Sequence, residues 1–233
     1  MRDKGLSPLY YAGSHGNLNT SYQNRTDSLT WNLEINFLIG NISPAIYPEI
    51  TSSKIRNIKA EINYSYLRFA KNIINENAKL MLGGMWKTQF ANYKHNQFQN
   101  SSINNYFLNT LNLSGSLSYP LRKNERQYLL VLQTNLPLIA FIIRPSYAYI
   151  KPKGFLEHNR SNVQNIMNSI EVCPFNRFSG LSSYISIEYE IKNNNSLRIG
   201  YKWEYWSHQS SNILETATHG IIIQMVFNLR NSK

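Results

Sequence analysis

Few residues in this chain have types and spacings that could carry out chemistry. His208 lies two positions before Ser210 in a polar segment, and a His-x-Ser spacing of this kind also arises readily by chance. The five histidines are scattered without the spacing of metal ligands. The single cysteine, Cys173, excludes an internal disulfide framework and suits a small apolar filler better than a nucleophile. Gly83 and Gly84 lie within an alternating segment and do not form a phosphate-binding loop. We therefore expect no cofactor and no metal.

Charged residues of both signs occupy alternate positions in several segments. Side chains on a strand point alternately to its two faces, so these charges share one face while apolar residues fill the other. If the strands close into a narrow barrel, the charged face lines its lumen, where opposite charges must pair. A selective pore or a proton path would instead need more strands or a lining of one sign. The predicted lumen network comprises Glu34, Lys59, Glu61, Lys87, Glu188, Glu190, Arg198, Lys202, Glu204 and Arg230.

Eight segments show this alternation, and turn residues separate them. Such segments, about ten residues long and rich in Tyr and Trp, are typical of transmembrane β-barrels. A weaker strand over Pro8–Tyr22 and another around Phe141–Ile150 would complete the set. The sequence predicts an all-β fold, a closed antiparallel transmembrane barrel of about eight to ten strands, as one domain over residues 1–233. The eight segments are Ser28–Gly40, Ile58–Tyr66, Lys79–Phe90, Leu111–Leu121, Gln127–Leu138, Ser179–Ile191, Ser196–Trp206 and His219–Arg230.

The predicted connections alternate between short and long, as the turns and external loops of outer-membrane barrels do. The short ones are Lys71–Ala78, Arg122–Arg126 and Lys192–Asn195. The long ones are Asn41–Lys54, Tyr93–Leu108, Arg144–Phe178 and His208–Thr218. Within Arg144–Phe178, the helical spacing of apolar residues over Ser161–Ile170 predicts a short helix, and an irregular loop is the alternative.

Composition limits the function classes. Hydrophobic residues make up 42% of the chain, yet the mean hydropathy is −0.40, so apolar residues are interleaved with polar ones. No run approaches the ~18 apolar residues of a membrane-spanning helix. The residues after Met1 are polar and do not form a signal peptide, so we expect an exported protein to have lost its signal.

The net charge of +11 comes without a dense Lys/Arg cluster or a nucleic-acid motif. It favours contact with membrane lipid and lipopolysaccharide headgroups over nucleic acid. A soluble, secreted β-sandwich would need a second sheet to cover the apolar faces, so the barrel is the better prediction.

Two features of the chain resemble known barrel proteins. The closing sequence Phe227-Asn228-Leu229 resembles the terminal strand of bacterial outer-membrane proteins, which presents an aromatic residue to the barrel-assembly machinery. The Asn- and Tyr-rich basic composition looks like that of barrels from Bacteroidetes-type Gram-negative bacteria. Both resemblances imply a location in the bacterial outer membrane.

The segment Tyr205–Asn212 resembles the His-x-Ser-Asn element of outer-membrane phospholipase A and the lipid A deacylases. The resemblance implies that His208 is the base, that Ser210 is the nucleophile attacking a lipid ester, and that Glu215 orients the histidine. Here Ser211 separates Ser210 from the asparagine, and alternation places His208 on the lumen face.

The sequence therefore leaves two functions open. We expect a non-enzymatic barrel, an accessory or structural subunit of a larger outer-membrane assembly that presents external loops, chiefly Arg144–Phe178, to a protein partner. The alternative is a lipid esterase that uses His208 and Ser210.

Overall fold

The computed structural model describes most of the chain. The described residues are 1–3, 10–45, 54–73, 77–95, 103–123, 126–144, 169–191, 195–209 and 213–227. Ser210, Arg230 and most of the helix predicted over Ser161–Ile170 lie outside them.

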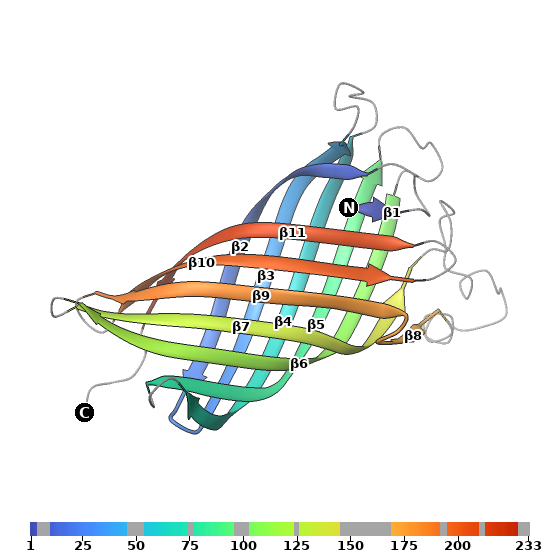
Figure 1. Ribbon diagram of the computed structural model, residues 1–233. Helices are drawn as coiled ribbons and strands as arrows, with labels where there is room; N and C mark the ends of the chain where they lie inside the picture. The colour runs from blue at the N-terminus through green and yellow to red at the C-terminus, as the bar shows by residue number, and fades with distance from the viewer. Residues whose placement is uncertain are drawn as a thin grey trace.

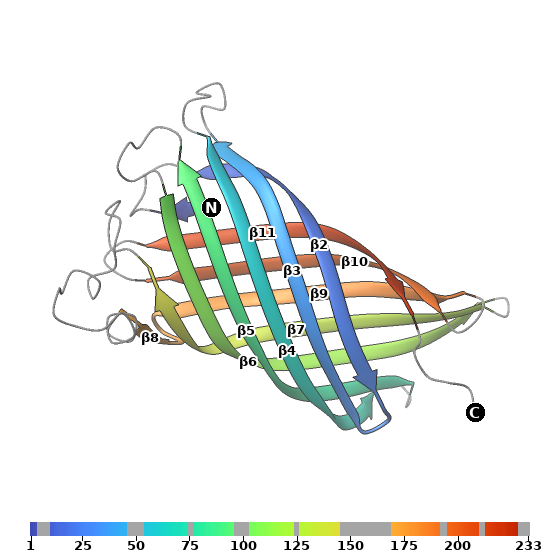
Figure 2. The same ribbon diagram turned by 180° about the vertical axis from the view of Figure 1, so that it is seen from behind.

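One antiparallel sheet contains all the strands of this part of the chain. Its order is β1, β11, β10, β9, β7, β6, β5, β4, β3 and β2, and each neighbouring pair is antiparallel. The sheet curls on itself so that β9–β11 face β2–β5 across the molecule (Figure 1; Figure 2). The strands are β1 (Arg2–Asp3), β2 (Tyr11–Arg25), β3 (Leu29–Pro44), β4 (Ile55–Ile73), β5 (Ala78–His95), β6 (Ile103–Lys123), β7 (Arg126–Ile143), β8 (Glu171–Pro174), β9 (Phe178–Glu190), β10 (Ser196–His208) and β11 (Leu214–Val226).

The fold confirms the prediction of an antiparallel barrel and extends its strands. Each of the eight alternating segments coincides with a strand over most of its length, although residues 228–230 lie outside the described ones, and the weak segment Pro8–Tyr22 contributes to β2. Phe141–Ile143 ends β7, while 145–150 lies outside the described residues. Several strands are much longer than expected, for example β6 at 21 residues and β4 at 19.

The two ends of the barrel differ in their connections. Residues 26–28, 74–77 and 124–125 join strands at what we call the turn end. Residues 45–54, 96–102 and 144–170 join them at the opposite end, the loop end. The predicted long connection His208–Thr218 is wrong in length, because β11 begins at Leu214 and leaves only residues 209–213. Backbone pairing with β10 continues the strand through this polar stretch.

The barrel is nearly, but not fully, closed. Nine long strands alternate in direction, so the first and the last, β2 and β11, run parallel to each other. At the loop end the short β1 joins them: Arg2 pairs with Glu215 on one side and forms a bridge to Tyr10 on the other. Farther toward the turn end, the amide of Gln224 donates a hydrogen bond to Asn19 across this seam. Among the described residues no backbone ladder joins β2 directly to β11.

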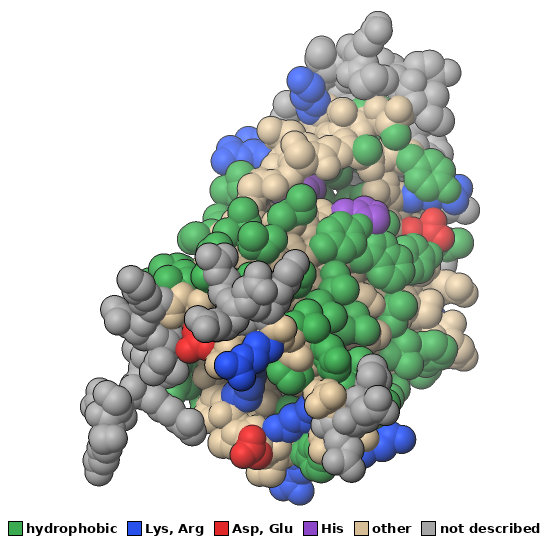
Figure 3. Space-filling model, turned by 60° about the vertical axis from the view of Figure 1, so that its left-hand side comes forward, with side chains coloured by type: hydrophobic (Ala, Val, Ile, Leu, Met, Phe, Trp, Pro, Cys, Tyr) green, Lys and Arg blue, Asp and Glu red, His purple; other side chains and the backbone are tan. Residues whose placement is uncertain are grey.

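The outer wall is apolar around its middle. On β4 the outward residues Ile58, Ala60, Ile62, Tyr64 and Tyr66 alternate with buried inward ones. Hydrophobic side chains gather across the visible face, and lysine and arginine lie mostly toward its ends (Figure 3). Ile62 is 50% exposed, as expected of a side chain that faces a surrounding medium rather than a protein core.

A bulge in β7 lies close to the loop end of the strand. Over Tyr128–Asn135 the strand pairs with β9, and over Ile139–Ile142 it pairs with β8 instead. Pro137 lies at the change of partner, where its missing N–H costs no ladder bond on that side. The extra residue shifts the inward parity, so that Asn135 and Ala140 are both buried.

Candidate functional site

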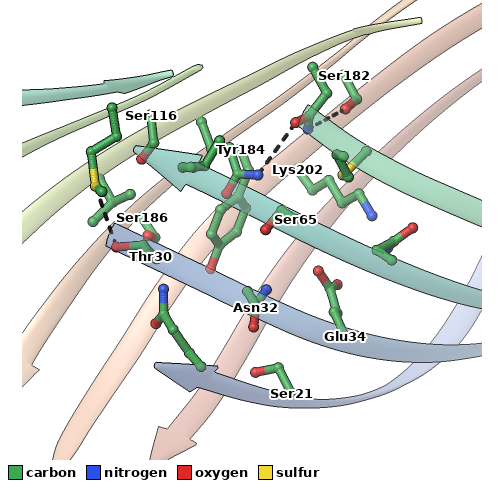
Figure 4. A pocket seen from close by; sticks show the side chains of 18 of the residues that line it. Ser21, Thr30, Asn32, Glu34, Ser65, Ser116, Ser182, Tyr184, Ser186 and Lys202 are labelled. Atoms are coloured by element: carbon green, nitrogen blue, oxygen red, sulfur yellow. Dashed lines mark hydrogen bonds between the residues drawn. The ribbon is translucent and has the colours of Figure 1, made fainter. Parts of the chain in front are cut away.

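The interior of the barrel has two zones. The first, which we call the lumen cavity, lies between the middle and the turn end and has polar walls. Its volume is about 120 Å³, and polar side chains from several strands point into it (Figure 4). The second zone, at the loop end, is an apolar cluster. The labelled residues of the cavity in Figure 4 are Ser21, Thr30, Asn32, Glu34, Ser65, Ser116, Ser182, Tyr184, Ser186 and Lys202.

Lys87 is the centre of the largest ion-pair group in the lumen. Its Nζ donates a hydrogen bond to Glu204 Oε1 at 2.6 Å and lies 3.7 Å from Glu61 Oε1. Lys202 Nζ lies 3.8 Å from the other oxygen of Glu61. These four residues come from β4, β5 and β10, which are far apart in sequence, so the group links opposite walls of the barrel.

Two further acidic residues of the lumen, Glu188 and Glu34, have separate partners nearer the turn end. Arg198 donates two hydrogen bonds to Glu188 Oε2, from Nη2 at 2.6 Å and from Nε at 3.1 Å. Glu34 accepts hydrogen bonds from the amides of Asn19 at 2.8 Å and Asn36 at 2.7 Å. Glu61, Glu188 and Glu204 thus pair with basic side chains, whereas Glu34 is bound by neutral amides.

Most of the predicted lumen set is where alternation placed it. Lys59, Glu61 and Lys87 are buried, and Glu34, Glu188, Arg198, Lys202 and Glu204 are partly buried on the inward face. Glu190 is exposed, because it is the last residue of β9 at the turn end. Arg230 lies outside the described residues.

The apolar zone, which we call the mouth cluster, was not predicted. The rings of Tyr106 and Trp206 stack with centroids 5.7 Å apart, and Phe178 stacks on Trp206 at 5.6 Å. Ile55, Leu108 and Ile142 pack in the same cluster, and each is 1% exposed. All nine of the long strands contribute residues to it, so apolar side chains fill the lumen at the loop end.

The two faces of the sheet exchange character between the zones. Near the middle of β4, polar Lys59 and Glu61 point inward while Ile58 and Ile62 point outward. At the loop end, Ile55 points inward and Arg56 outward. The same exchange occurs on the neighbouring strands, where the outward residues near the loop end include Asn41 of β3, Lys94 of β5 and Asn105 of β6.

His208 lies at the edge of the mouth cluster and does not face the outside of the barrel. Its side chain is 1% exposed, and its Nε2 lies 3.5 Å from Cys173 Sγ and 3.5 Å from Glu171 Oε2. Glu171 also pairs with Arg177, whose Nη2 is 3.1 Å from the other carboxylate oxygen. Burial, followed by the charge of Glu171, raises the pKa of the Cys173 thiol to about 11.

The predicted catalytic trio is not assembled among the described residues. Ser210 lies outside them. Glu215 lies 3.9 Å from Arg2 of β1, and the carboxylate beside His208 is that of Glu171. No pattern in the sequence predicted this contact, because Glu171 and Cys173 are more than thirty positions from His208 and belong to the short strand β8.

The other described histidines serve separate local contacts. His15 Nε2 and the amide of Asn57 are 3.0 Å apart, and His219 Nδ1 lies 2.5 Å from the Tyr201 hydroxyl. His95 packs edge-on against Tyr11. His158 lies outside the described residues.

Comparison with known proteins identifies no relative of the chain. No protein-family description, no curated protein and no solved structure matches it. Over the described residues, no helix is long and apolar enough to cross a membrane.

Proposed function

We propose that this protein is a non-enzymatic barrel of the bacterial outer membrane, an accessory or structural subunit that presents its loop end to a partner within a larger assembly. The exchange of faces along the strands carries the proposal. An apolar exterior with a polar interior suits lipid, whereas a polar exterior with an apolar interior suits water. Both patterns occur in one sheet, which supports a barrel embedded over its middle and projecting at its loop end.

The dimensions of the outer apolar surface support insertion. On β4 the outward apolar residues extend from Ile58 to Tyr66, a span of eight residues, or about 26 Å along the strand at about 3.3 Å per residue. Allowing for strand tilt, this approaches the apolar band of outer-membrane barrels, roughly 25 Å tall.

An aromatic group marks the turn end of this surface. Trp31 lies between Tyr22 and Tyr64, with ring centroids 5.2 Å and 6.5 Å away. Tyr128 and Tyr189 form a second pair at 5.3 Å. Aromatic girdles of this kind occur where barrels meet lipid headgroups, and nearby basic residues such as Arg68 and Lys71 favour contact with phosphorylated lipid.

The closed interior argues against transport as the activity. The mouth cluster fills the loop end of the lumen, and Lys87, Arg198 and Lys202 below it are held in ion pairs. A permeation path would need a continuous wet lining. The surfaces available to bind a partner are therefore the polar outer rim and the long connections at the loop end.

The seam between β2 and β11 adds support for an assembly. Backbone N–H and C=O groups along unpaired strand edges must find partners when they lie in hydrocarbon. Leu18 of β2 is 73% exposed, and Ile221 and Ile223 of β11 are 78% and 70% exposed, well above the outward residues of the paired wall. Contact with a further polypeptide segment would cover these side chains and edges.

The test is purification of the tagged protein from its native outer membrane in mild detergent, followed by mass spectrometry of the proteins that copurify. We expect partners in fixed stoichiometry. A control in which residues 145–168 are replaced by a short flexible linker should keep the barrel in the membrane and reduce partner recovery. A barrel that purifies alone after mild extraction would contradict the proposal.

The same preparation tests the esterase alternative. Hydrolysis of lipid esters by the wild type, lost in both His208→Ala and Ser210→Ala, would establish the enzyme. The geometry favours the opposite result, because His208 is buried beside Cys173 and Glu171.

A further inference from the structure

Three potential metal ligands from distant parts of the chain meet beside the mouth cluster. Glu171 and Cys173 are two residues apart on β8, so both point to the same face of that strand. His208 reaches the same point from the end of β10. The ligand atoms of the three side chains all lie within 4.8 Å of one another.

Two of the three separations match those between ligands around a tetrahedral ion, and the third, from Cys173 Sγ to the Glu171 carboxylate, lies within 4.8 Å. Zinc binds cysteine sulfur at about 2.3 Å, histidine nitrogen at about 2.0–2.1 Å and carboxylate oxygen at about 2.0–2.2 Å. At a tetrahedral angle these bond lengths place sulfur and nitrogen about 3.5 Å apart, and nitrogen and oxygen about 3.4 Å apart. The corresponding separations are 3.5 Å from Sγ to Nε2 and 3.5 Å from Nε2 to Oε2.

The surroundings hold these side chains in place. Cys173 and His208 are almost completely buried, so their rotamers are fixed by packing. Arg177 binds Oε1 of Glu171 at 3.1 Å and leaves Oε2 directed at His208. A ligating carboxylate is commonly oriented by such a hydrogen bond to its second oxygen. Glu171 is about one third exposed, which gives an ion a path from solvent.

A purely hydrogen-bonded trio accounts for the arrangement less well. Cys173 and Glu171 both approach the same nitrogen of His208, whereas a catalytic or structural relay would place them on different nitrogens. Among the described residues, Nδ1 of His208 is buried without a hydrogen-bond partner. Three groups converging on one point, instead of forming a chain, is the geometry of a shared ligand.

We propose that Glu171, Cys173 and His208 bind one divalent transition-metal ion of the zinc type, with water in the fourth position, at the loop end of the barrel. Binding forms the metal–sulfur bond and releases the thiol proton to solvent. The ion ties β8 to β10 across β9, and so fixes the wall beside the mouth cluster. This site is independent of the function proposed above.

The test uses the full-length protein, folded in detergent and freed of metal with a chelator. Titration with Zn²⁺ by calorimetry should give one site per chain. Titration with Co²⁺ should produce the absorption of a tetrahedral ion and a sulfur-to-cobalt charge-transfer band, which Zn²⁺ removes on competition. Binding should become stronger as the pH rises, because the thiol must lose its proton.

Variants assign the ligands. Cys173→Ser should abolish the charge-transfer band, and His208→Gln and Glu171→Gln should each weaken Zn²⁺ binding by at least about tenfold. The control is His219→Gln, which removes an outward histidine bonded to Tyr201 and should leave binding unchanged. A change of gel mobility on heating verifies that each variant is folded.

The wild-type spectrum alone can overturn the proposal, whatever the variants do. Folded protein that gives no thiolate band with Co²⁺ has no such site. Binding that survives Cys173→Ser but is lost in His219→Gln would place the ion elsewhere and would equally contradict the assignment.

Discussion

One continuous sheet forms both the mouth half of the barrel, which holds the mouth cluster, and the middle half, which holds the ion pairs of the lumen. The two halves place apolar and polar side chains on opposite faces of that sheet. In the mouth half Tyr106 and Trp206 pack inside while Arg56 and Asn105 face outward. In the middle half Lys87 and Glu204 pair inside while Ile62 faces outward. The backbone pairing is antiparallel in both, so the difference lies in which side chains face inward.

The comparison illustrates how the order of apolar and polar side chains along a strand depends on the medium outside the sheet. Where the outside is water, apolar side chains gain by pointing inward, and the lumen fills as a soluble core does. Where the outside is lipid, they gain nothing by leaving it, and the polar residues are the ones that must find partners inside. Under the proposed insertion in a membrane, the exchange of faces marks the level at which the barrel leaves the lipid.

The largest expected effect is in the middle half. Lys87→Ala leaves Glu61 and Glu204 buried without their nearest cation, and losing one partner of a buried pair costs about 3–5 kcal/mol. Urea unfolding in detergent micelles measures the loss. The matched control is Lys79→Ala, whose partner Asp27 is fully exposed, and its effect should stay below about 1 kcal/mol. Similar losses in the two variants would mean that the lumen charges are solvated.

The mouth half should respond to the loss of packing instead of charge. Trp206→Ala removes the middle ring of the Tyr106–Trp206–Phe178 stack and should lower the free energy of unfolding by about 3–4 kcal/mol. Trp86→Ala is the comparison, because Trp86 is 53% exposed on the outer wall and leaves no buried cavity. If both substitutions cost the same, the mouth cluster is not a packed core.

On the outer wall, a charged side chain should be tolerated in the mouth half and not in the middle half. Ile62→Arg places a charge in the apolar band and should destabilise the barrel in a bilayer by about 2–4 kcal/mol. Arg56→Gln, six residues toward the loop end, should change stability by less than about 0.5 kcal/mol. Equal tolerance at the two positions in folding experiments with lipid vesicles would contradict insertion of the middle half.

The smallest effect concerns a residue that alternation assigned to the lumen. Glu190 is exposed at the end of β9, so Glu190→Gln should leave unfolding unchanged within about 0.5 kcal/mol. Glu188→Gln, one inward position earlier, should lose far more because it removes the carboxylate that Arg198 and Ser196 bind. A comparable loss at both positions would extend the lumen network to the turn end.

Alternation predicts the middle half well and the mouth half poorly, for one physical reason. A prediction from alternation requires that one face of the strand be apolar and the other polar, with the apolar face always outside and the polar face always inside. On β4 the apolar face changes from outward to inward between Lys59 and Ile55, so the alternation with apolar residues outward stops at Ile58 although the strand begins at Ile55. The same reversal hid the start of β6, whose residues Tyr106 and Leu108 are apolar and inward.

Contacts made by the short strands could not be predicted from the sequence. β8 has four residues, too few for a periodic signal, and yet it brings Glu171 and Cys173 to His208. β1 has two residues and joins β2 to β11. Each depends on pairing with a distant strand, which local patterns do not encode.

The most direct test of the exchange of faces is a measurement of lipid contact at Arg56 and Ile62. Each is replaced in turn by a single labelled cysteine in a Cys173→Ser background, and the fluorescence of the label is quenched by spin-labelled lipid in vesicles. We predict strong quenching at position 62 and weak quenching at position 56, because in the proposed insertion the wall leaves the membrane between them. Equal quenching at the two positions, or none at position 62, would contradict the account.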